Sequence, residues 1–251
     1  MIYHGLEKAK TERKKKFAVL IDPDKIKTER IDQVINLAKV SNVDYFFLGG
    51  SLILDDEMNF CIEMIKRNTN IPVVLFPGST MQVNHKADTL LFLSLISGRN
   101  PDLLIGKHVE SAPLLLNSPL EVLPTGYMLI DGGTPTSVQY MSNTRPIPAN
   151  KKDIALCTAL AGQLLGMKLI FMDAGSGAKF PISEKLIKTV SSKLSIPLIV
   201  GGGIRTPERA VASAKAGADV IVVGNAIEDD PTLLMEISSA VHSLKLASTE
   251  R

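Results

Sequence analysis

The sequence has few of the residues that mark common metal and nucleophilic sites. Its 251 residues include only two cysteines, Cys61 and Cys157, which lie far apart in helix-like segments. No second Cys or His stands near either one at metal-ligand spacing, so both are expected to be packing residues. The four histidines are equally scattered, at His4, His85, His108 and His242. We therefore expect neither a histidine-based metal site nor a charge-relay triad.

A strong charge of one sign is also missing. The net charge is +2, whereas domains that bind a nucleic-acid backbone usually carry a marked basic excess, so we expect no nucleic-acid partner. No segment offers the run of about 18 apolar residues that a transmembrane helix needs. Residues 1–16 are polar and lack the apolar stretch of a secretory signal. A cytoplasmic protein is expected, and a small anionic substrate is compatible with this balance of charge.

Short apolar runs alternate with longer segments of helical period through most of the chain, a pattern typical of parallel strands and crossover helices. A length of 251 residues suits eight such units, which typically need about 250. We expect an α/β protein with a single (β/α)8 TIM barrel over residues 1–251, regular or modified, with 1–16 as a polar lead-in. The predicted strands comprise residues 17–21, 45–48, 73–76, 89–93, 126–130, 169–172, 198–200 and 220–223. The pattern is weakest between residues 94 and 150, where several prolines bound or interrupt the stretches.

Glycines follow the last two predicted strands. Gly201, Gly202 and Gly203 come directly after the seventh strand, and Gly224 with Asn225 follows the eighth. Glycine lets backbone N–H groups approach a phosphate without obstruction, and the loops after strands seven and eight of a barrel frequently share one phosphate. These two loops therefore predict a phosphate cradle, although tight turns alone would also use glycine.

Three further polar segments end predicted strands. Asp173-Ala174-Gly175-Ser176-Gly177 follows the sixth strand, Asp22-Pro23-Asp24-Lys25 follows the first, and Gly49-Gly50-Ser51 follows the second. Carboxylate and hydroxyl oxygens are the ligands that Mg2+ accepts when it also bridges to substrate phosphates. A Mg2+ site on the first two loops is one reading, and a capped turn before the first helix is the other.

Taken in order, these five segments resemble the geranylgeranylglyceryl phosphate synthase family, which includes bacterial heptaprenylglyceryl phosphate synthases. The resemblance covers nearly the whole chain. It implies a Mg2+-dependent prenyltransferase that joins a polyprenyl diphosphate, with geranylgeranyl diphosphate favoured, to the sn-3 hydroxyl of sn-glycerol 1-phosphate. The product is an ether, and diphosphate is released.

The resemblance also implies roles for individual residues. Asp22 and Ser51 would bind Mg2+ beside the prenyl diphosphate, with Lys25 as a nearby cation. The glycerol phosphate and its hydroxyls would be bound by Phe171, Asp173, Ser176, Gly177, Gly202, Gly203, Gly224 and Asn225. Asp173 would also act as the catalytic base for the attacking hydroxyl.

Two positions depart from the family pattern. Asp173 stands where the family generally has Glu, and Phe171 stands where it has Tyr. Asp is shorter by one methylene, and Phe lacks a phenolic donor, so the identity of the base is left open by the sequence. The length of the prenyl chain is open too, because it depends on a groove for which Leu52, Ile53, Phe76, Met81, Phe92 and Leu93 are only candidates.

Two other functions are kept as alternatives. One is a different barrel enzyme with the same phosphate cradle, such as an isomerase, a lyase or a flavin mononucleotide enzyme. The other is a noncatalytic protein that binds a phosphorylated ligand. The resemblance further implies a homo-oligomer, and a lipid-like product suggests transient contact with a membrane surface, although we expect no anchor.

Overall fold

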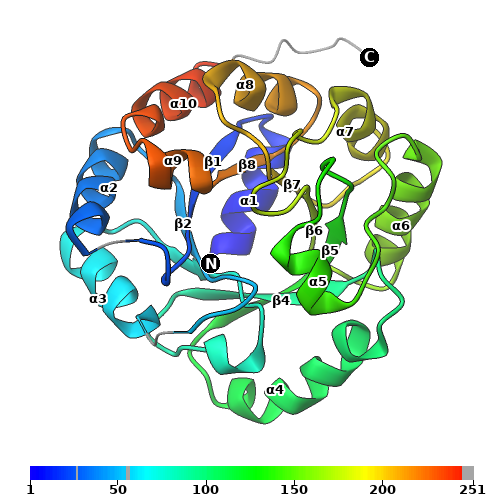
Figure 1. The fold of residues 1–251 in the computed structure, drawn as a ribbon, viewed down its shortest axis with the longest axis horizontal. Coiled ribbons are helices and arrows are strands. Elements are labelled where there is room, and N and C mark those ends of the chain that lie inside the picture. Colours follow the sequence, from blue (N-terminus) through cyan, green and yellow to red (C-terminus); the bar gives the residue numbers. More distant parts are fainter. Residues whose placement is uncertain (27, 55–56, 245–251) are drawn as a thin grey trace.

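Eight parallel strands close into a barrel in the computed structural model, which describes residues 1–26, 28–54 and 57–244 (Figure 1). The strands follow one another around the barrel in chain order, and β1 pairs with β8 through Lys16 and Val220. Their bounds are β1 Lys16–Ile21, β2 Tyr45–Leu48, β3 Val73–Leu75, β4 Thr89–Leu95, β5 Glu121–Leu129, β6 Leu169–Asp173, β7 Leu198–Gly201 and β8 Val220–Val223. The expected (β/α)8 barrel is confirmed.

The strand bounds differ most from expectation in the region where the pattern was weakest. β5 begins at Glu121 rather than Gly126, and it pairs with β4 along the whole length of that strand. Pro124 lies inside this early part of β5, and its carbonyl accepts the N–H of Lys168 at 2.8 Å. A proline cannot donate to a ladder, which is why a sequence pattern discounts such a stretch as a strand.

Helices surround the barrel in most of the strand connections (Figure 1). The longer ones are α2 Thr28–Val40, α3 Met58–Asn68, α4 Lys107–Leu116, α6 Lys152–Leu164, α7 Glu184–Ser191, α8 Pro207–Lys215 and α10 Leu233–His242. Between β3 and β4 the chain forms only the short 3-10 helix η1 (Thr80–Gln82), so the barrel is a modified one. The π-helix η2 (Asp102–Gly106) leads into α4, and the short helices α5 (Ser137–Ser142) and α9 (Asn225–Asp229) follow β5 and β8.

The expected polar lead-in is instead a helix that covers one end of the barrel. In α1 (Ile2–Thr11), Leu6 and Ala9 are buried, and Leu6 belongs to the same apolar cluster as the inward-facing side chains of the strands. The backbone N–H of Ile2 donates to the Glu121 carboxylate at 2.5 Å, which ties the start of α1 to β5. Spacing of three and four residues between Ile2, Leu6 and Ala9 gives the helix its apolar face.

Residues 13–16 form a basic run that leads into β1, and one lysine of this run is buried. Lys15 is 7% exposed, and its Nζ lies 3.5 Å from Asp219, which also receives Lys10 at 2.9 Å. Burial lowers the pKa of Lys15, while the charge of Asp219 opposes this effect. The run therefore fixes α1 and β1 against the turn before β8.

A second carboxylate holds the same end of the barrel together. Asp44 accepts hydrogen bonds from Lys16 at 2.7 Å and from the backbone N–H of Phe17 at 2.8 Å, and His242 Nε2 lies 2.8 Å away. Burial works to raise the pKa of Asp44, but these hydrogen bonds outweigh it and lower the pKa. The carboxylate joins β1 and the turn before β2 to the last helix.

Candidate active site

The opposite end of the barrel carries the polar segments that the sequence singles out. Because all eight strands are parallel, the loops after β1, β2, β6, β7 and β8 meet at the carboxyl ends of the strands. The predicted site residues are therefore brought to one rim.

Asp173 is the last residue of β6 and is 8% exposed. Its Oδ2 accepts the phenolic O–H of Tyr127 at 2.6 Å, and its Oδ1 accepts the backbone N–H of Gly175 at 2.8 Å. Burial raises the pKa of Asp173, although both hydrogen bonds act in the opposite direction. A buried carboxylate with a raised pKa is a stronger base than an exposed one, as general-base catalysis near neutral pH requires.

Tyr127 is a site residue that the sequence analysis did not single out. It comes from β5 and is 5% exposed, and burial beside Asp173 raises its phenolic pKa well above the ordinary value. The phenol therefore stays protonated and donates to the carboxylate. The predicted strand of residues 126–130 placed Tyr127 near its beginning, whereas β5 extends from Glu121 to Leu129 and brings Tyr127 toward its carboxyl end, beside Asp173.

An aromatic layer lies beneath this carboxylate. Phe171 is 1% exposed and stacks on Phe76 with ring centroids 5.1 Å apart, while the ring of Tyr127 meets it edge-on at 5.6 Å. Gly201 lies against the same ring, since a Cβ added there would be 3.2 Å from Phe171 Cε2. Phe171 thus packs under the site, where its ring supports Tyr127 and Asp173 from below.

The glycine loops surround Asp173 from the side of β7 and β8. A Cβ added to Gly202 would lie 2.6 Å from Asp173 Oδ1, so the backbone of the β7 loop lies directly against the carboxylate. Ser176 Oγ donates to Asn225 Oδ1 at 2.8 Å, which joins the β6 loop to the β8 loop. Gly177 has open space on its Cβ side. Three loops thus share one corner of the rim.

The remaining glycines of the predicted cradle lie at its edges. Gly203 has a positive φ of 69° and lies against the backbone of Phe180 and Pro181, which continue the β6 loop. Gly224 precedes α9 and lies beside Leu20 of β1. The cradle residues are therefore contiguous from β6 through β8 to β1, as the phosphate prediction requires.

The predicted metal ligands lie across the rim, on β1 and β2. Asp22 follows β1, and its carboxylate is so close to Gly50 that an added Cβ there would be 3.1 Å from Oδ1. Ser51 is the next residue of that loop. Lys25 Nζ pairs with Asp22 Oδ2 at 2.6 Å, so the three residues assigned to the donor side are adjacent.

Gln82 holds the β2 loop in place and is a second residue that sequence reasoning missed. It is 6% exposed, and its Nε2 donates to the carbonyl of Gly50 at 2.9 Å. Its Oε1 accepts the N–H of Gly78 at 3.0 Å, which adds the β3 loop to the same network. A buried amide that bonds only to backbone carries no recognisable sequence motif.

These donor groups fit a magnesium ion only in partnership with a substrate phosphate. Over the described part of the chain, no cluster of three or more His, Cys, Asp or Glu side chains would hold a metal ion by itself. Asp22 offers one partly exposed carboxylate beside the Ser51 loop. Mg2+ commonly binds in this way, through one or two carboxylates together with waters and substrate phosphates.

The candidate groove residues are distributed over different environments. Leu52 and Met81 are 54% and 93% exposed, and Phe76 belongs to the aromatic layer. Phe92 instead faces the surrounding helices, where its ring centroid lies 4.4 Å from that of His108 in α4. Phe92 therefore packs outside the barrel and does not line the rim.

Comparison with known proteins gives one family. Residues 10–242 match the PcrB family. A geranylgeranylglyceryl phosphate synthase of Chitinophaga pinensis is 56% identical over 242 residues, covering 96% of this chain and 96% of its own length. A protein of the same name from Thermococcus kodakarensis is 40% identical, covering 87% of this chain and 86% of its own.

Solved structures agree with these relatives. The structure of (S)-3-O-geranylgeranylglyceryl phosphate synthase from Thermoplasma acidophilum, in complex with the substrate sn-glycerol-1-phosphate, has a TM-score of 0.91 at 32% identity and covers 97% of this chain and 99% of its own. A thiamine phosphate pyrophosphorylase from Pyrococcus furiosus, at 15% identity and a TM-score of 0.57, shares the fold alone.

Proposed function

This chain belongs to the PcrB family, and on that premise we propose that it transfers a prenyl group from a polyprenyl diphosphate to sn-glycerol 1-phosphate. The observation that carries the proposal is the buried Asp173 carboxylate, held by Tyr127 and placed against Gly202 in a cradle of three loops. A base beside a phosphate cradle is the arrangement that a phosphorylated alcohol requires as nucleophile.

On the acceptor side, the phosphate group of sn-glycerol 1-phosphate rests on the backbone of the β7 and β8 loops. Gly202, Gly203, Gly224 and Asn225 supply that backbone, and Ser176 and Gly177 close the β6 side. The anchored phosphate directs the sn-3 hydroxyl to Asp173. As the oxygen forms the ether bond with the first carbon of the prenyl chain, the carboxylate accepts the hydroxyl proton.

On the donor side, the bond between that carbon and the diphosphate oxygen breaks, and the diphosphate leaves with the bonding electrons. Asp22 and Ser51 are the residues that would hold Mg2+, which when bound neutralises charge developing on the leaving group. Lys25 adds a positive charge beside the same phosphates. The stacked rings of Phe76 and Phe171 form an apolar layer beneath the proposed position of the reacting atoms.

Geranylgeranyl diphosphate is the proposed donor, because relatives and the solved structure are named for the geranylgeranyl product. We also propose a cytoplasmic homo-oligomer that touches the membrane transiently to collect this donor. Exposed apolar side chains such as Ile105 and Val109, at 61% and 66%, support such contacts. Among the described residues, no helix is both long and apolar enough to cross a bilayer. Sedimentation of the purified protein, alone and with lipid vesicles, tests the oligomeric state and the membrane contact.

A transfer assay tests the activity itself. Labelled sn-glycerol 1-phosphate is incubated with prenyl diphosphates of increasing length, with Mg2+ present or chelated, and organic-extractable label is counted. We expect extractable product that requires Mg2+ and peaks at the geranylgeranyl donor. Extractable product that persists after chelation would refute the Mg2+ requirement but not the activity. Folded protein that forms no product from any donor would refute the activity.

Substitution of the base tests the mechanism. Asp173→Ala and the near-isosteric Asp173→Asn are expected to lose turnover by a factor of about 10^2 to 10^4, the usual contribution of a general base. Both variants should still bind sn-glycerol 1-phosphate in calorimetry, because the phosphate is held by the glycine loops. Turnover near the wild-type rate in either variant would show that another group accepts the proton.

A further inference from the structure

One side chain joins the two halves of the rim. Glu228 lies in α9, the short helix that begins at Asn225, and its Oε1 accepts the backbone N–H of Asp22 at 3.2 Å. The two residues are 206 positions apart in the sequence. This hydrogen bond connects the loop assigned to the acceptor phosphate with the loop assigned to the donor and its metal ion.

The position of Glu228 depends directly on the phosphate loop. The N–H groups of Ile227 and Glu228 both donate to the carbonyl of Gly224, at 2.8 and 3.2 Å. One helical turn therefore separates the backbone proposed to bind phosphate from the carboxylate that reaches Asp22. A displacement of Gly224 would move Glu228 with it.

Arg30 of α2 holds the other end of α9. Its guanidinium donates to the carbonyl of Glu228 and lies 3.5 Å from the carbonyl of Asp229. Two contacts thus fix the short helix α9. The backbone N–H of Asp22 donates to the Glu228 side chain, and the guanidinium of Arg30 donates to the backbone of α9. The two contacts leave α9 little freedom to move independently of the β1 loop.

The carboxylate of Asp22, the proposed metal ligand, is held by several contacts. Asp22 Oδ1 accepts the N–H of Asp24 at 3.3 Å, Oδ2 pairs with Lys25, and the group lies against Gly50. Pro23 follows directly and restricts the backbone of Asp22. A bond to the N–H of Asp22 therefore fixes the backbone that carries this carboxylate beside the Ser51 loop.

We propose that Glu228 is a positioning residue that couples the acceptor-phosphate loop to the donor loop, so that occupation of either subsite favours binding at the other. This inference rests on the proposed function of the two subsites. Glu228 touches neither substrate and acts through Asp22. Because coupling between two binding equilibria is reciprocal, each ligand strengthens the other by the same factor.

Calorimetry measures this coupling with simple probes. The affinity for sn-glycerol 1-phosphate is determined alone and with saturating Mg2+ and inorganic pyrophosphate, and the ratio of the two dissociation constants is the coupling factor. For the wild type we expect a factor of about 5 or more, the lower end of typical coupling between sites. Glu228→Ala should bring the factor close to one while the affinity for sn-glycerol 1-phosphate alone changes little.

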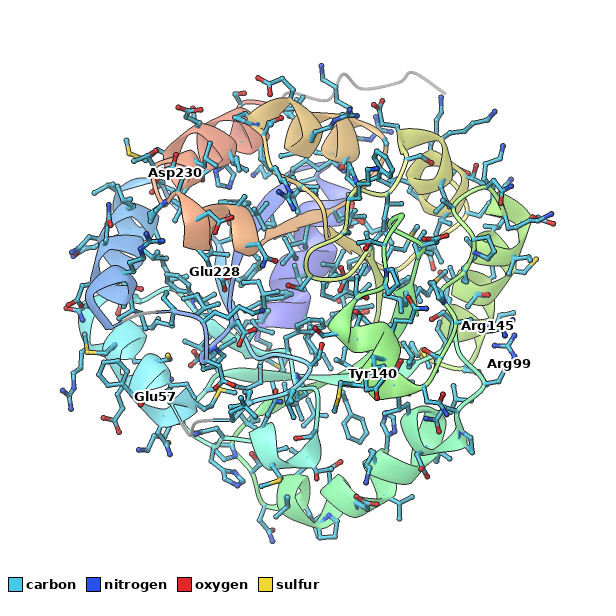
Figure 2. The ribbon with its side chains drawn as sticks, viewed as in Figure 1. Glu57, Arg99, Tyr140, Arg145, Glu228 and Asp230 are labelled. Atoms are coloured by element: carbon cyan, nitrogen blue, oxygen red, sulfur yellow. The ribbon has the colours of Figure 1, made fainter. Side chains whose placement is uncertain are left out.

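Three more variants separate positioning from loss of stability. Glu228→Gln keeps an acceptor oxygen and should retain the coupling. Glu228→Met keeps the length of the side chain without an acceptor and should lose the coupling, so it replaces the alanine variant if that one is too unstable to study. Asp230→Asn is the matched control, because the Asp230 carboxylate accepts hydrogen bonds from the N–H and the hydroxyl of Thr232, two residues further on in its own turn. Figure 2 labels both Asp230 and Glu228. Asp230→Asn should retain the wild-type factor.

The outcomes distinguish the coupling from the activity. A wild type that forms prenyl product but shows a factor of one, or a Glu228→Met variant that keeps the wild-type factor, would overturn the coupling and leave the activity in place. Wild-type protein that forms no product in the transfer assay would overturn the proposed function instead. Loss of coupling in the Gln variant as well would show that the hydrogen bond to Asp22 is not its cause.

Discussion

Two glycines with the same backbone conformation allow a sharp test of how the β7 loop shapes the site. Gly202 and Gly177 have φ values of 81° and 80°, a region in which a side chain is strained. Alanine at either position should therefore cost about 1 to 2 kcal/mol from backbone strain alone. The surroundings differ, because nothing lies within 4 Å of an added Cβ at Gly177.

At Gly202 the same methyl group would enter occupied space. It would lie 2.6 Å from Asp173 Oδ1 and 2.7 Å from the backbone nitrogens of Ala174 and Gly175. Overpacking of this kind costs about 1 to 3 kcal/mol, so Gly202→Ala should lower the free energy of unfolding by about 2 to 5 kcal/mol in total. The difference between the losses of unfolding free energy in Gly202→Ala and Gly177→Ala isolates the clash with the carboxylate and its hydrogen-bonded loop.

Urea unfolding and the transfer assay measure the two consequences. Relief of the clash requires Asp173 or its loop to move, and a displacement of about 1 Å at a reacting group costs about a hundredfold in rate. We expect Gly202→Ala to lose turnover by that factor while it remains folded at low denaturant. Equal destabilisation of the two alanine variants, or turnover of Gly202→Ala near the wild-type rate, would refute the close approach of the β7 loop to Asp173.

Three other perturbations have defined outcomes. Tyr127→Phe removes a hydrogen bond that lowers the pKa of Asp173, so this pKa should rise. The acid limb of the pH profile of kcat/KM should then move to higher pH. An unchanged limb would contradict the role of the phenol. Leu6→Ala removes a side chain that is 5% exposed at the covered end of the barrel, and urea unfolding should show a loss of about 2 to 5 kcal/mol with little change in turnover of the folded enzyme. Asp44→Asn should cost about 1.5 to 3 kcal/mol at pH 7, because hydrogen bonds to the charged group, including the one from His242, are weakened. Because the pKa of Asp44 is lowered in the folded protein, its contribution to stability is fully present above the unfolded pKa of about 3.9 and is lost as the pH falls through the folded pKa. Wild type and Asp44→Asn should therefore approach equal stability in acid. A stability difference that persists there would have another origin.

The fold was largely predictable because its signals are local. Strands covered on both faces are nearly continuous apolar runs, and β2 and β8 have the bounds that the sequence predicts. The glycine loops were predictable for the same reason, since a turn that requires a positive φ selects glycine at that position. Chain order around a parallel barrel then places the loops after β6, β7 and β8 side by side.

The failures of prediction have equally local causes. Pro124 hid the first half of β5, and the many charges of residues 1–16 hid the narrow apolar face by which α1 covers the barrel. The burial of Lys15 also has no local signal, because a sequence does not reveal that Asp219 lies within reach of it.

The sequence by itself determined the barrel, the order of the loops and the types of group at their tips. Only the tertiary structure decided which groups touch, because contacts across a barrel depend on strand register and closure and leave no trace in local spacing. Tyr127 meets Asp173 across 46 positions, and Glu228 meets Asp22 across 206. The chain therefore encodes its chemical groups locally, whereas closure of the barrel creates the pairs that would make those groups act together.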